Sequence, residues 1–237
     1  ATLCTFLPAD GRLLVLANRA YRRRLAQLAA RLRSSHQAQD QGELAPTNLE
    51  RLAATMWIRS CDVNERIRRY GLLLSAIEAG ADLDAADSPL QLSAEEKTQT
   101  LSVLDGQVYN LTPKKKRTMV LLRLDAALSS GEARYEFDYT TVEHVLPQNP
   151  EGKSEWCLWW PNAEERAKQV HRLGNLALLN RKQNSAASNW DFAKKKTKYF
   201  FGRSGASPFA LTTEVVARDQ WTPQDFAERQ QRFLKLL

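Results

Sequence analysis

Four polar residues in the second half of the chain have the side-chain types that phosphodiester hydrolysis needs: Glu143, His144, Asn175 and Asn184. This reaction requires a base that activates water and a divalent cation that neutralises charge on the phosphate and the leaving oxygen. A neutral imidazole near pH 7 is a suitable base, and hard cations such as Mg²⁺ prefer oxygen ligands. The residue types therefore point to His144 as a base, with Glu143 and Asn184 able to bind a metal ion.

Each of these residues also has a more ordinary interpretation. Asn184 can cap the N-terminus of a helix, a position that Asn favours, and Asn175 can be a turn residue after Gly174. In the functional interpretation, the Asn175 amide instead fixes the loop that follows the histidine and orients the imidazole. Glu143 can be a carboxylate that orients His171 or an arginine, and His171 can be an auxiliary residue.

Glu143 and His144 fall in a segment, residues 137–146, that the sequence predicts as a strand. β-Branched and aromatic residues are frequent there, helix signals are absent, and a proline follows. Adjacent residues on a regular strand point to opposite faces of the sheet. A bulge or twist is therefore needed to bring Glu143 and His144 to one site.

The elements after this strand are also short. A helix is expected at 161–171, a second strand at 175–180 and another helix at 190–200, which gives the order strand–turn–strand–helix. Asn184 then lies near the start of the helix expected at 190–200, where free backbone N–H groups also suit a phosphate. Thr222-Pro223 predicts the start of a final helix with Pro at its first position.

The first half of the sequence is typical of helices. Residues 17–33 form an amphipathic, arginine-rich stripe. Thr47 and Glu50 match a capping box before an apolar run. One or two helices are expected to follow as far as Ala79, with Gly80 as a C-terminal cap.

Two more helices are expected before the strands. Ser93 and Glu96 form a second capping-box pattern, which predicts a helix to about Val108. Thr112-Pro113 predicts the next helix, with Thr at the N-cap and Pro at the first helical position.

The charge of the chain favours a polyanionic partner. The 237 residues contain 34 Lys and Arg against 27 Asp and Glu, a formal net charge of +7. Between residues 164 and 203 there are ten basic and three acidic residues, next to the candidate metal ligands. We therefore expect contacts to DNA phosphates from Arg181, Lys182, Lys194, Lys195, Lys196 and Lys198.

Four blocks of sequence occur in an order that closely resembles the C-terminal HNH-like nuclease domain of GmrSD-type proteins. They are VEHVLPQ (142–148), LGNLALL (173–179), NSAASN (184–189) and FAKKKTKY (192–199). Those proteins act in type IV restriction or antiphage defence, SspE-like proteins among them. They pair this domain with an N-terminal ParB-like NTPase domain, whose nucleotide motifs are absent from this sequence.

The resemblance implies a ββα-metal fold around one divalent ion, Mg²⁺ or Mn²⁺. By carry-over, His144 is the general base, Asn175 the middle Asn of the HNH triad, and Asn184 the terminal metal-binding residue. Glu143 stands where many HNH nucleases have a metal-binding Asp.

We therefore expect a mostly α protein with a small HNH-like core, divided into a helical part (1–130) and a nuclease region (131–237). No stretch of sequence is apolar enough to cross a membrane. Three scattered cysteines suggest the cytoplasm, and the start without Met suggests the C-terminal part of a larger protein. The expected function is metal-dependent nicking or cutting of duplex DNA in defence. The alternatives are a non-catalytic nucleic-acid-binding module and a helical protein–protein adaptor.

Overall fold

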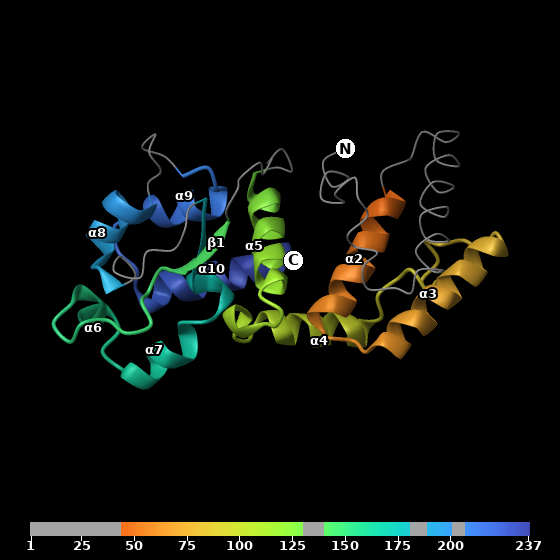
Figure 1. Ribbon diagram of the computed structural model, residues 1–237, viewed down its shortest axis with the longest axis horizontal. Helices are drawn as coiled ribbons and strands as arrows, with labels where there is room; N and C mark the ends of the chain where they lie inside the picture. Colours follow the sequence, from red (N-terminus) through yellow and green to blue (C-terminus); the bar gives the residue numbers. More distant parts are fainter. Residues whose placement is uncertain (1–43, 130–139, 181–188, 201–206) are drawn as a thin grey trace. The chain divides into compact units, whose positions relative to one another are not determined.

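The computed structural model describes residues 44–129, 140–180, 189–200 and 207–237 (Figure 1). It divides the chain into two compact units, Ala1–Thr100 and Leu101–Leu237. This division lies before the expected boundary at residue 130, because helix α5 (Lys115–Leu128) packs against helix α9 (Ala210–Val216) and both strands of the second unit. The helix expected at 17–33 lies outside the described residues.

The first unit contains helices α2 (Leu44–Ile58) and α3 (Val63–Glu78). Helix α2 begins before the predicted Thr47 cap, which is therefore wrong; Pro46 sits in the first turn, where a missing N–H is tolerated. Gly80 follows α3 with φ of 66°, as expected of a C-terminal glycine. The buried core of this unit is formed by Leu52, Met56, Leu73 and Leu90.

Helix α4 (Ala94–Leu104) begins with the capping box that the sequence predicts. The Glu96 N–H donates to Ser93 Oγ at 3.1 Å, and the Ser93 N–H donates to Glu96 Oε2 at 2.9 Å. The helix ends at Leu104, before the expected Val108, and a 3₁₀ turn, η3 (Val108–Asn110), follows.

Helix α5 starts later than the sequence predicts. Its N-cap is Lys114, so the assignment of Thr112 as N-cap and Pro113 as first helical residue is wrong. The Lys116 N–H donates to the Pro113 carbonyl and closes a turn ahead of the helix. The apolar face of α5 is buried through Val120, Leu121 and Leu124.

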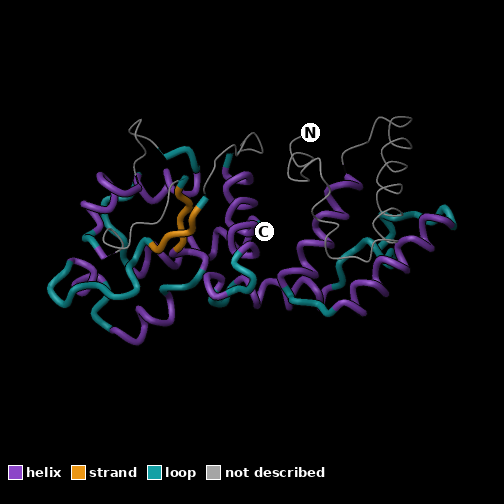
Figure 2. Tube along the Cα trace, viewed as in Figure 1, coloured by secondary structure: helices purple, strands orange, loops and turns teal. Residues whose placement is uncertain are grey.

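Two antiparallel strands, β1 (Thr141–His144) and β2 (Leu176–Leu179), form a small sheet in the second unit (Figure 2). The register is continuous, from Thr141 opposite Leu179 to His144 opposite Leu176. Every residue of β2 is buried. Both predicted strands, 137–146 and 175–180, are therefore confirmed, and each observed strand is shorter than its predicted range.

The remaining elements of the second unit are helical. They are α6 (Glu155–Trp159), α7 (Ala163–Gln169), the 3₁₀ turn η4 (Leu173–Asn175), α8 (Phe192–Lys195), the π-helical turn η6 (Lys196–Phe200) and α10 (Pro223–Leu236). The predicted start of α10 is confirmed, with a capping box between Thr222 and Asp225. The described chain is thus mainly helical with one small sheet, and none of its helices is long and apolar enough to span a bilayer.

Candidate active site

His144 lies at the end of β1, and both of its ring nitrogens have a partner. The residue is 4% exposed. Its Nε2 lies 3.0 Å from Nδ1 of His171, and its Nδ1 lies 3.3 Å from the amide nitrogen of Gln148. The Tyr109 ring of η3 packs against the imidazole, with 4.2 Å between ring centroids. The candidate base is therefore enclosed by residues from three segments of the second unit.

Electrostatics keep the His144 imidazole neutral. Burial lowers the pKa of His144 to about 3, and the interactions with His171, Lys195 and Arg117 act in the same direction. The pKa of His171 is also lowered, by burial and by Arg117. A neutral imidazole keeps the lone pair that a base needs, but a low pKa weakens that base.

Asn175 fixes the loop that follows β1. Its Oδ1 accepts from the Leu146 N–H at 2.8 Å and from Trp221 Nε1 at 3.2 Å. Its Nδ2 donates to the carbonyls of Leu146 at 3.0 Å and Val170 at 2.8 Å. The fully buried amide thus uses both donors and both acceptor positions. The contact between Asn175 and the histidine loop is present, and it is made to the backbone rather than to the imidazole.

Helix α10 holds the turn that carries Asn175. Arg229 Nη1 donates to the carbonyls of Gly174 at 2.8 Å and Leu176 at 2.9 Å, while Oε1 of Gln230 accepts from the Gly174 N–H at 2.6 Å. A Cβ at Gly174 would lie 3.0 Å from both the ring and the carbonyl oxygen of Phe226. A side chain at position 174 would therefore need Phe226 or the turn to shift by a few tenths of an ångström.

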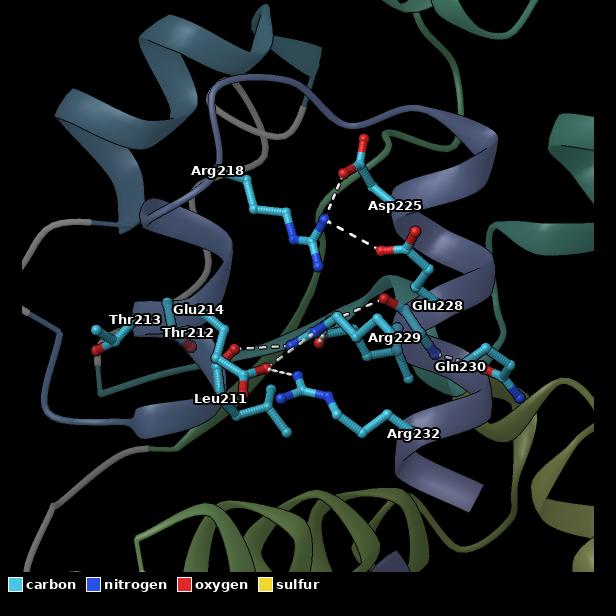
Figure 3. A network of polar contacts seen from close by, with 12 residues as sticks. Leu211, Thr212, Thr213, Glu214, Arg218, Asp225, Glu228, Arg229, Gln230 and Arg232 are labelled. Carbon is cyan, nitrogen blue, oxygen red and sulfur yellow. Dashed lines mark hydrogen bonds and ion pairs between the residues drawn. The ribbon is translucent and has the colours of Figure 1, made fainter. Parts of the chain in front are cut away.

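The same arginine joins α10 to α9, as Figure 3 shows. Arg229 Nη2 donates to the Leu211 carbonyl at 2.7 Å, and its Nε lies 3.7 Å from Glu214 Oε2, which also pairs with Arg232. Burial lowers the pKa of Arg229 to about 9. One buried side chain thus links the Asn175 turn, strand β2 and two helices.

Glu143 and His144 do not share a face of the sheet. The register through Glu143–Ala177 and His144–Leu176 contains no bulge, so the two side chains project in opposite directions. Glu143 is buried, and its charge acts on Lys195. The expected bulge is therefore absent from β1.

Lys195 is buried beneath the end of β1 rather than exposed to a phosphate. Its Nζ donates to the carbonyls of His144 at 2.7 Å and Val145 at 3.0 Å. Burial lowers the pKa of Lys195 to about 7, against an opposing effect of Glu143. The expectation that Lys195 contacts DNA is thus corrected, because its ammonium group is fully buried and serves the backbone that carries His144.

The other described lysines of this segment differ in exposure. Lys194 is exposed, with its Nζ 4.2 Å from the ring centroid of Trp190, and Lys198 is also exposed. Lys196 is partly buried and donates to the Arg218 carbonyl. Phosphate contacts by the exposed Lys194 and Lys198 therefore stay a prediction. Three further expected site residues, Arg181, Lys182 and Asn184, lie outside the described residues.

Only one of the two predicted metal ligands, Glu143, lies among the residues that the structure describes. Within them, no three His, Cys, Asp or Glu side chains come together as a metal-binding group. Glu143 lies on the opposite side of the strand from the His144 ring. The predicted pair of metal ligands, Glu143 and Asn184, therefore stays a prediction.

Sequence reasoning missed three residues around the base. Tyr109 and Arg117 precede the strand by many residues, and no motif connects them to it. Gln148 belongs to the VEHVLPQ block, and its position four residues after His144 was a usable signal, because a short turn after the strand can return a side chain to the ring.

Comparison with known proteins assigns the chain to a family. The model of the family described as GmrSD restriction endonucleases, C-terminal domain, matches residues 96–236. This match covers more than half of the chain and contains the candidate active site, so the protein belongs to this family of restriction endonuclease domains. The resemblance predicted from the four sequence blocks is confirmed. A search of curated proteins found no match.

Proposed function

We propose that the second unit is a metal-dependent endonuclease that nicks or cuts duplex DNA, with His144 as the general base. The main support is the neutral His144 at the end of β1, in a loop fixed by Asn175, in a chain of a restriction endonuclease family. The fixed loop holds the imidazole in one place, which favours a positioned base once a water molecule reaches a ring nitrogen.

The chemistry of the proposal follows from the surroundings of His144. The imidazole takes a proton from water, the water oxygen bonds to phosphorus, and the bond to the leaving oxygen breaks. In the free protein His144 is a weak base, because burial lowers its pKa to about 3. A phosphate brings negative charge to the ring, which favours the protonated imidazole and raises the pKa. Substrate binding therefore strengthens the base.

The order of elements supports an HNH-like core as part of this proposal. Strands β1 and β2 pair with each other, with α6 and α7 between them along the chain, and helix α8 follows β2; the two strands and the helix thus come in the order of a ββα motif. Asn175 would be the middle residue of the triad, acting through the backbone of the loop after His144.

The metal requirement is proposed from the resemblance, with Mg²⁺ or Mn²⁺ bound by Glu143 and Asn184. A bound cation would neutralise charge on the phosphate and the leaving oxygen. Glu143 faces Lys195 and not the His144 ring, so the described side chains do not form a complete donor set beside the base. The proton transfer from water to the His144 imidazole does not involve the metal ion.

The cellular role of the domain is also proposed from the resemblance to GmrSD-type proteins. The domain would act in the cytoplasm in antiphage restriction, coupled to a ParB-like NTPase domain that selects the target. Lys194 and Lys198 offer phosphate contacts, which carry no base information. We therefore expect the domain itself to bind unrelated DNA sequences about equally.

A supercoiled plasmid tests this function. We expect the protein to convert it to nicked or linear DNA with Mg²⁺ or Mn²⁺, and to leave it intact when EDTA is in excess. Cleavage that persists in EDTA would contradict the metal requirement, and no cleavage with either ion would contradict the nuclease assignment.

The burial of His144 favours a second candidate, a nucleic-acid-binding module without catalysis. A ring that is 4% exposed, with partners on both nitrogens, does not reach solvent in the described arrangement. This candidate predicts DNA retardation at low salt and intact plasmid under all metal conditions.

A further inference from the structure

We propose that His171 is a positioning residue for His144, whose Nδ1 accepts a hydrogen bond from the Nε2–H of His144 and so keeps the lone pair of His144 on Nδ1. The inference rests on the proposed nuclease function, because it concerns the orientation of the base in that reaction. His171 acts through the His144 ring.

The two contacts of the His144 ring define one tautomer. The amide nitrogen of Gln148 can only donate a hydrogen bond, and it lies 3.3 Å from Nδ1 of His144. This contact assigns the acceptor role to Nδ1 and the proton of the neutral ring to Nε2. That proton points to Nδ1 of His171 at 3.0 Å, which must then carry a lone pair.

The position of His171 is itself fixed. The backbone N–H of Tyr109 donates to the His171 carbonyl at 3.0 Å. The rings of Tyr109 and His171 are stacked, with centroids 5.3 Å apart and 12° between the planes. The Arg117 guanidinium lies 3.8 Å from the Tyr109 ring centroid and donates to the Tyr109 carbonyl. This layered arrangement leaves the acceptor nitrogen of His171 in a defined place.

The 3.0 Å contact between the two rings requires an acceptor on His171. An imidazolium at His171 would present N–H to N–H and break the hydrogen bond. The contact is therefore made by a neutral His171 whose lone pair is on Nδ1.

The consequence concerns which nitrogen meets the reacting water. Gln148, the partner of Nδ1 of His144, is exposed. Its side chain can therefore move away and leave Nδ1 open to a water molecule. A proton from water would enter at Nδ1, while the Nε2–H stays bonded to His171. Without the acceptor on His171, the proton of the His144 ring can occupy either nitrogen, or the ring can rotate. In both cases fewer molecules carry the lone pair on Nδ1 that accepts the proton from water.

Two substitutions separate hydrogen bonding from packing. His171→Asn places an amide oxygen near the position of Nδ1 but removes the ring, whereas His171→Phe keeps an aromatic ring on Tyr109 and removes the acceptor. Cleavage is measured in single turnover at saturating DNA, with DNA affinity and melting temperature measured in parallel. We expect His171→Phe to be slower by roughly tenfold or more at unchanged DNA affinity, and His171→Asn to recover most of that loss. Wild-type cleavage by His171→Phe, or equal slowness of both variants, would overturn the assignment.

Nitrogen-15 NMR shifts of the His144 ring in the free protein give a readout that needs no cleavage. The wild-type protein should show the Nε2–H tautomer, His171→Asn should retain it, and His171→Phe should lose it in part. An Nδ1–H tautomer in the wild-type protein would overturn the proposal even if the domain cleaves DNA. If the wild-type protein does not cleave DNA, the nuclease function fails and the NMR result alone decides the role of His171.

Discussion

At His144, burial keeps the imidazole neutral and at the same time weakens it as a base. The ordinary pKa of a histidine is about 6.5, and in the folded protein it falls to about 3. Between these values the unfolded chain binds a proton that the folded chain does not. The free energy of unfolding therefore falls as the pH falls from about 6.5 towards 3.

This linkage gives a stability prediction for His144→Asn, which cannot titrate. From pH 6 to pH 4, the wild-type protein should lose up to about 1.4 kcal/mol of unfolding free energy per pH unit more than the variant. Urea denaturation at several pH values measures this difference. Parallel pH dependences for the two proteins would show that His144 titrates normally.

We predict that a carboxylate in place of the Asn175 amide strongly destabilises the protein. In Asn175→Asp the two amide donors are lost, and a carboxylate oxygen faces the carbonyls of Leu146 and Val170 inside the core. We expect a loss of about 3 kcal/mol or more in unfolding free energy. The exposed Asn149→Asp is the matched control and should change stability by less than about 0.5 kcal/mol. A neutral effect of Asn175→Asp would contradict the hydrogen-bond assignment.

At the scale of elements, the α8–η6 segment places its lysines in different environments. Lys194 and Lys198 are exposed on successive turns, whereas Lys195 is buried. The double variant Lys194→Gln/Lys198→Gln should weaken binding of unrelated DNA sequences alike. It should also reduce the slope of log affinity against log salt by up to about 1.8, at roughly 0.9 per lost phosphate contact.

A control with the same loss of charge is available for this test. Lys153 and Lys235 are both exposed and lie outside the α8–η6 segment. Lys153→Gln/Lys235→Gln should leave the salt slope nearly unchanged. Equal slopes for the two double variants would place the DNA on another surface.

The close approach of α10 to the Asn175 turn predicts the effect of a single methyl group. Gly174→Ala puts its Cβ 3.0 Å from backbone and ring atoms of Phe226, which cannot both move away cheaply. We expect a loss of about 1–3 kcal/mol in unfolding free energy together with slower DNA cleavage. A Cβ at Gly152 would have no neighbouring atom within 4 Å, so Gly152→Ala should be close to neutral in the same denaturation experiment.

Local signals in the sequence predicted the parts of the fold that local physics determines. The Ser93–Glu96 capping box and the helix start at Thr222-Pro223 each depend on contacts within one helical turn, so both could be predicted without tertiary information. Thr112-Pro113 carried an equally local signal and failed, because the chain makes a turn before α5 begins.

Long-range packing set the features that the sequence did not reveal. Lys195 stands between two other lysines, and only the return of α8 onto β1 decides that its ammonium group is buried under the His144 carbonyl. Tyr109 lies on a 3₁₀ turn far from His144 in the chain, so its contact with the base follows from tertiary structure alone.

At the scale of the whole molecule, two compact units carry a formal net charge of +7. Leu101–Leu237 holds every described residue of the candidate active site, and the family match covers 96–236. Electrostatic attraction of a basic protein to DNA weakens as salt screens it. Binding and cleavage must therefore be measured separately before a loss of activity is assigned to the active site.

The central claim, that His144 is the base of a DNA-cleaving reaction, is tested most directly by single-turnover cleavage with His144→Ala. DNA is held at saturation with Mg²⁺ or Mn²⁺, and affinity is measured in the same buffer. A rate lower by roughly 10²–10⁴-fold at unchanged affinity is the predicted result. Cleavage by His144→Ala near the wild-type rate would show that another group activates the water.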